Sequence, residues 1–96
     1  MIDAVLIPLA DCCVQLGIEE SFVFTLEERG LTHTIHESQT VFIDANELGH
    51  LEKIVRLHKE LSINVEGIEV VMHLLERIDR LQSEISSLSN KLRLYE

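Results

Sequence analysis

The sequence predicts a mostly α-helical protein with a small β wing and a long C-terminal helix. Apolar residues near the C-terminus are spaced alternately three and four apart, whereas residues 31–43 show the alternating period of strands. The long helix therefore carries an apolar seam held for about 3.5 heptads, which is typical of a coiled coil, so we expect it to mediate dimerisation. The seam consists of Val71, Leu74, Ile78, Leu81, Ile85, Leu88, Leu92 and Tyr95.

Two short helices are predicted near the N-terminus. The segment Ile2–Ile7 is rich in strand formers and predicts a strand before them. Pro8 suits the first position of a helix, and Gly17 supplies its C-terminal stop, so the first helix should span residues 8–16. Glu19–Arg29 predicts the second helix, with its apolar residues Phe22, Val23 and Leu26 facing inward.

A hairpin and a third helix are predicted next. Strand-like residues 31–36 and 40–43 flank Glu37-Ser38-Gln39, which indicates two strands and a turn. Asp44 and Glu47 have the spacing of a capping box, so the third helix should begin there and run to about Leu61.

The last helix should begin after a short break. Asn64 can cap it, and Ile63 and Ile68 have the spacing of a hydrophobic staple. The prediction is therefore a small domain in residues 1–62 and a long helix in residues 63–96.

The excess of negative charge lies in the first half of the chain. Residues 1–52 contain ten acidic residues and one basic residue, Arg29, which gives a net charge of −9, whereas residues 53–96 contain seven of each. Such a surface repels phosphate and attracts basic partners. The candidate partner-binding residues are the four acids of the second helix: Glu19, Glu20, Glu27 and Glu28.

The segment Leu57–Met72 resembles the CbpM-type chaperone modulators, a group within the MerR-like winged helix-turn-helix family. Its turn, Leu61-Ser62-Ile63-Asn64-Val65-Glu66-Gly67-Ile68, is similar to the Leu-x-Ile-Asn/Asp-x-x-Gly-Ile/Val turn of that group. The resemblance extends over nearly the whole chain and is strongest in residues 55–80. It implies a MerR-like winged helix domain followed by a dimerisation helix.

The resemblance also implies a function and a partner. Members of that group bind the J-domain of a DnaJ-like or CbpA-like co-chaperone and inhibit it. We therefore expect a non-enzymatic modulator that forms a homodimer in the cytoplasm, where its partner could bring it to the nucleoid. The acidic first half agrees with this expectation, because J-domains carry a basic helix.

A MerR-family DNA-binding transcriptional regulator is the main alternative, and a purely structural coiled-coil adaptor is another. A DNA reader of this type needs Arg and Lys on the second helix and the wing to neutralise phosphates. Here the second helix has four acids and one base, and residues 32–44 contain no Lys or Arg. The charge therefore argues against direct nucleic-acid binding.

Metal, cofactor and catalytic sites are not expected. Cys12 and Cys13 should pack in the core as small apolar residues, and His33 and His36 would lie on opposite faces of a strand. There is no Gly-rich phosphate loop and no recognisable pair of nucleophile and base. The longest apolar run, Ala4–Ala10, is too short to span a membrane.

Overall fold

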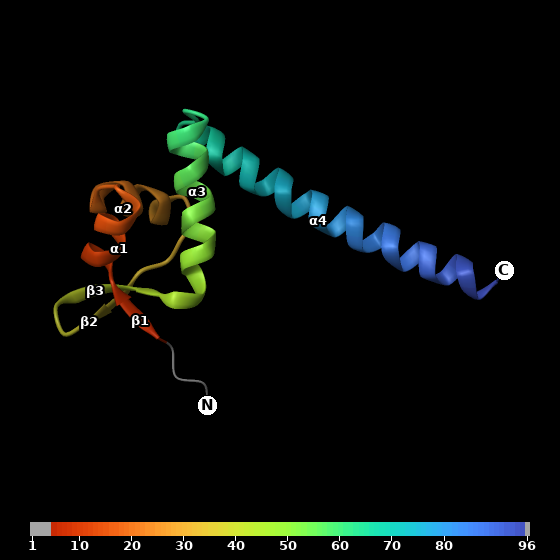
Figure 1. Ribbon diagram of the computed structural model, residues 1–96, viewed down its shortest axis with the longest axis horizontal. Helices are drawn as coiled ribbons and strands as arrows, with labels where there is room; N and C mark the ends of the chain where they lie inside the picture. Colours follow the sequence, from red (N-terminus) through yellow and green to blue (C-terminus); the bar gives the residue numbers. More distant parts are fainter. Residues whose placement is uncertain (1–4, 96) are drawn as a thin grey trace.

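The structure, a computed structural model, describes residues 5–95 and confirms the mostly α-helical fold with a small wing and a long last helix. Figure 1 shows that the long helix, α4, leaves the rest of the molecule at one end of α3. The elements, in chain order, are β1 (Leu6–Pro8), α1 (Leu9–Leu16), α2 (Glu20–Glu28), β2 (Ile35–Glu37), β3 (Thr40–Asp44), a 3-10 turn (Ala45–Glu47), α3 (Leu48–Glu60) and α4 (Val65–Leu94).

The three strands of the described residues form one antiparallel sheet in the order β1-β3-β2. The strand predicted for Ile2–Ile7 begins only at Leu6, and its residues 2–4 lie outside the described part of the chain. Pro8 was expected to open the first helix, but it is the last residue of β1. Its extended backbone, with φ −55° and ψ 134°, allows it to pair with Phe42 of β3 before α1 begins at Leu9.

The wing is shorter than the alternating pattern predicted. Leu31 and Thr32 are consecutive and both buried, which a strand with two different faces does not permit. The segment before β2 is therefore an irregular loop. The turn lies where it was predicted, because Ser38 and Gln39 both adopt positive φ, at 49° and 63°, between the paired Glu37 and Thr40. Two consecutive positive φ angles are typical of a two-residue hairpin turn, here made without glycine.

The predicted capping box before the third helix is only partly correct. Asp44 Oδ1 accepts a hydrogen bond from the backbone N–H of Asn46 at 2.9 Å. This bond caps a 3-10 turn, and α3 begins after it at Leu48.

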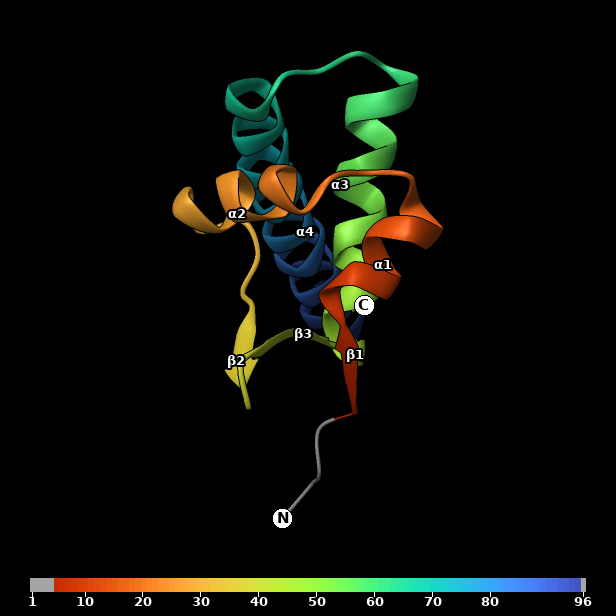
Figure 2. The same cartoon turned by 90° about the vertical axis from the view of Figure 1, so that its left-hand side faces the viewer.

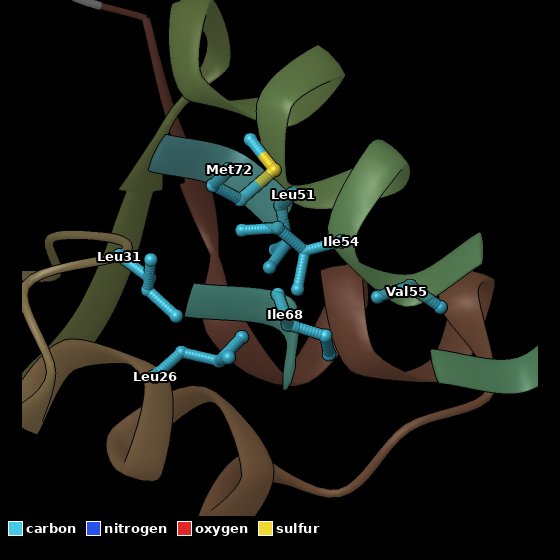
Figure 3. Close-up of a cluster of buried hydrophobic side chains, with 7 residues drawn as sticks. All are labelled: Leu26, Leu31, Leu51, Ile54, Val55, Ile68 and Met72. Atoms are coloured by element: carbon cyan, nitrogen blue, oxygen red, sulfur yellow. The ribbon is translucent and has the colours of Figure 1, made fainter. Parts of the chain in front are cut away.

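Within residues 5–95, two groups of buried side chains make up the core. The larger group, drawn in Figure 3, joins α2, the loop after it, α3 and the start of α4: Leu26, Leu31, Leu51, Ile54, Val55, Ile68 and Met72. The smaller group joins α1, α2 and β3: Leu9, Cys12, Cys13, Val23 and Ile43. The cysteines therefore pack in the core as predicted, and the first two turns of α4 share the core of the preceding helices.

The geometry of the turn between α3 and α4 explains which residues are found there. Asn64 Oδ1 accepts a hydrogen bond from the backbone N–H of Gly67 at 2.8 Å, so the predicted cap is confirmed. A Cβ at Gly67 would lie 2.7 Å from Ile63 Cγ2 and 3.1 Å from Asn64 Oδ1, so glycine lets the capping residues approach the helix. In Figure 2 this turn lies at the end of α3 opposite the sheet.

Candidate partner-binding surface

Helix α2 carries the four predicted acids at its two ends. Glu19 is the N-cap and Glu20 the first helical residue, whereas Glu27 and Glu28 lie in the last turn. Glu19, Glu20 and Glu28 are exposed, and Glu27 is half-buried. At about 1.5 Å per residue the two pairs stand roughly 10 Å apart along the helix. The structure thus places three of the four carboxylates where a partner could reach them freely.

Glu27 has a structural contact that the sequence pattern did not predict. Its Oε2 accepts hydrogen bonds from the backbone N–H and the hydroxyl of Thr34, both at 2.7 Å. These hydrogen bonds to Thr34 hold the pKa of Glu27 below its ordinary value of 4.5. The carboxylate therefore ties the end of α2 to the segment that leads into the wing.

Arg29, the single basic residue of the acidic half, is directed towards α4. Its two terminal nitrogens lie 3.0 Å from Glu66 and 2.9 Å from Glu69. Within residues 5–95, neither Glu20 nor Glu28 forms an ion pair, and Glu19 forms none either. The exposed surface of α2 therefore keeps its negative charge.

A depression lies beside the N-terminal end of α2, and no local sequence pattern indicated it. Its volume is ≈ 460 Å³, and its walls include Ile18, Phe22 and His58. Phe22 and His58 are 36 positions apart, yet their ring centroids lie 4.6 Å apart. The depression forms only because α3 folds back against the α1–α2 turn.

The predicted seam of α4 is exposed along most of its length. Val71 is half-buried, but the exposed fraction is 52% at Leu74, 64% at Leu88 and 88% at Tyr95. At 3.6 residues per turn the seam lies about 140° around the helix from the buried pair Ile68 and Met72. The face that packs on the domain and the seam are therefore two different faces of α4.

His50, His58 and the two cysteines serve packing and hydrogen bonding. His50 Nε2 donates to the carbonyl oxygen of Leu31 at 2.8 Å, and His58 Nδ1 donates to that of Ile63 at 2.9 Å. Burial, the larger cause, and neighbouring negative charge raise the pKa of both thiols, Cys12 and Cys13. Among residues 5–95 no group of three or more His, Cys, Asp or Glu side chains could hold a metal ion. In that same range no helix is long and apolar enough to cross a membrane.

Comparison with known proteins agrees with the sequence resemblance. The chaperone modulatory protein CbpM of Pseudomonas entomophila (strain L48) is 29% identical over 82 residues, which is 83% of this chain and 80% of that protein. The family described as MerR HTH family regulatory protein matches residues 7–90. Neither description names an enzyme. The match runs from β1 through most of α4, and we conclude that this chain belongs to the MerR helix-turn-helix family of regulatory proteins.

Proposed function

We propose that this protein is a non-enzymatic modulator of a DnaJ-like co-chaperone, which it inhibits by binding the basic J-domain through the acidic surface of α2. The similarity to a chaperone modulatory protein supports the general role. Such a partner would place the protein in the cytoplasm.

The exposed negative charge of α2 is the main support for this proposal. Glu19, Glu20 and Glu28 are exposed, and the nearest basic residue in sequence, Arg29, is bound to Glu66 and Glu69. A clustered negative surface steers basic partners during association and repels phosphate. Glu27, held by Thr34, supports this surface by fixing the end of α2.

The experiment is a titration of the protein with a purified J-domain from a DnaJ-like co-chaperone. Changing Glu19, Glu20 and Glu28 together to Gln should weaken binding about tenfold or more at low salt, and the loss should shrink as salt screens the charges. The control changes three exposed acids on α3 and α4 to Gln, which alters net charge equally: Glu52, Glu60 and Glu76. Equal affinities for the two triple variants would contradict the role of α2.

DNA binding is the competing function that the family match brings with it. The same acidic α2 surface opposes it, because phosphate contacts from basic residues supply most of the affinity for DNA. Gel shifts at low salt separate the two: tight, salt-sensitive binding to duplex DNA would overturn the modulator proposal.

We also propose that the protein is a homodimer held by the seam of α4. An exposed apolar stripe from Leu74 to Tyr95, facing away from its own domain, needs a partner surface. The outer seam also extends about 20 Å beyond Arg80, where the domain does not reach. Truncation after Arg80 should convert the dimer to a monomer, as measured by light scattering, and an unchanged dimer would refute the role of the outer seam.

A further inference from the structure

The depression beside α2 has a fixed apolar floor. Phe22 and His58 stack with their ring planes 31° apart, and His58 Nδ1 also donates a hydrogen bond to the carbonyl oxygen of Ile63. Ile18 packs against both core clusters. Because contacts within the domain hold these side chains in place, the floor is formed before any partner binds.

The exposed charges around its rim are two acids, Glu19 and Glu20, and one base, Lys59. Lys59 contributes to the wall, but its Nζ donates to the carbonyl oxygen of Leu16 at 2.9 Å, at the C-terminal end of α1. This hydrogen bond directs Lys59 towards the C-terminal end of α1, where a cation is favourably placed. Glu19 is exposed on the same rim, and Glu20 follows it. The apolar floor and the two acids of α2 suit a partner that offers an apolar side chain with a basic side chain next to it.

We propose that this depression is the centre of the co-chaperone contact: it receives an apolar side chain from the basic helix of the partner, while Glu19 accepts a hydrogen bond from a neighbouring Lys or Arg. The proposal rests on the proposed function and names the site at which it occurs. A buried apolar anchor surrounded by charged contacts is the usual arrangement of an interface whose affinity depends on few residues.

The test fills the depression without changing charge. Ser21 and Thr25 line it and are exposed, so Ser21→Trp and Thr25→Trp should each leave the fold intact, as checked by thermal unfolding. Each should weaken binding to the purified J-domain by about tenfold or more, because truncating or blocking a central anchor has effects of this size. The control is Thr40→Trp on the exposed wing, which should bind as the wild type does.

The outcomes separate the site from the function. If the wild type does not bind the J-domain, the proposed function fails and the inference fails with it. If the wild type binds and both tryptophan variants bind equally well, or Thr40→Trp weakens binding as much as they do, only the site is wrong. Loss of the dimer in Ser21→Trp would assign the depression to a second copy of the chain and would also overturn the inference.

Discussion

The charges beside the seam of α4 predict an antiparallel orientation of two paired helices and limit their register. Arg77, Glu84 and Lys91 recur every seventh residue, each immediately before a seam residue. In an antiparallel pair this flank of one helix faces the same flank of the other. Setting Arg77 opposite Glu84 of the second copy creates two attractive pairs, because the symmetry repeats the contact.

This register also aligns the seam. Ile78 then packs against Leu81 of the second copy, and Leu74 packs against Ile85. A shift by one heptad brings Glu84 against Glu84 in one direction and Arg77 against Arg77 in the other, both repulsive. A shift by two heptads sets Glu84 opposite Lys91 instead, so a variant at Arg77 distinguishes the two attractive registers. A parallel pair would set Arg77 near Gln82, with no opposite charge, so only the antiparallel arrangement makes these two residues partners.

Arg77→Glu should therefore weaken the dimer. Two pairs that each contribute about 0.5 kcal/mol become two repulsive pairs of similar size, a change of about 2 kcal/mol or roughly 30-fold in the dimer Kd. Sedimentation equilibrium at low salt measures this Kd. The double variant Arg77→Glu with Glu84→Arg should restore the wild-type value, whereas Arg80→Glu, which lies away from the seam, should change it less than about twofold. A double variant no tighter than the single one would refute the register.

Three further outcomes follow from contacts within the domain. Gly67→Ala should lower the free energy of unfolding by about 1 kcal/mol, because the crowding of the new Cβ outweighs the gain in helix propensity. Gly49→Ala has open space around it and should raise the free energy of unfolding by up to about 1 kcal/mol. Urea denaturation measures both variants, and equal effects would contradict the crowding at Gly67. Since hydrogen bonds hold the pKa of Glu27 below 4.5, its stabilising effect is complete above that pH and is lost as the pH falls through the lower folded-state pKa. The stability difference between the wild type and Glu27→Gln should thus shrink below pH 4.5, and a difference independent of pH would exclude this linkage. Burial raises the pKa of Cys12 and Cys13 above 9.0, so iodoacetamide at pH 8 should modify them slowly in the native protein and quickly in urea, and rapid native labelling would contradict their burial.

The features that could be predicted from sequence are those that short segments determine. Gly17 adopts φ 66° at the end of α1, and the Asn64 side chain caps α4, as their residue types indicated. The period of the seam likewise identified α4, because 3.5-residue spacing needs no knowledge of the rest of the chain. Each of these depends on interactions within one or two helical turns.

Contacts between distant segments could not be predicted. The alternation in residues 31–36 indicated a strand, but tertiary packing buries Leu31 and Thr32 together. All four acids of α2 were candidate partner-binding residues, and only the folded loop shows that Thr34 binds Glu27. The depression between α2 and α3 depends on the packing of Phe22 on His58, which no local spacing reveals.

The ion pairs of Arg29 have a consequence for how two copies would meet a partner. They join the end of α2 to the first turns of α4, so the orientation of α2 is coupled to that of the long helix. In a homodimer built on α4, a helix about 45 Å long, the two acidic surfaces would then be held at a constant separation. A bivalent partner whose basic helices match that separation would gain 10²–10⁴-fold in avidity through effective concentration, whereas a partner with one such helix would gain none.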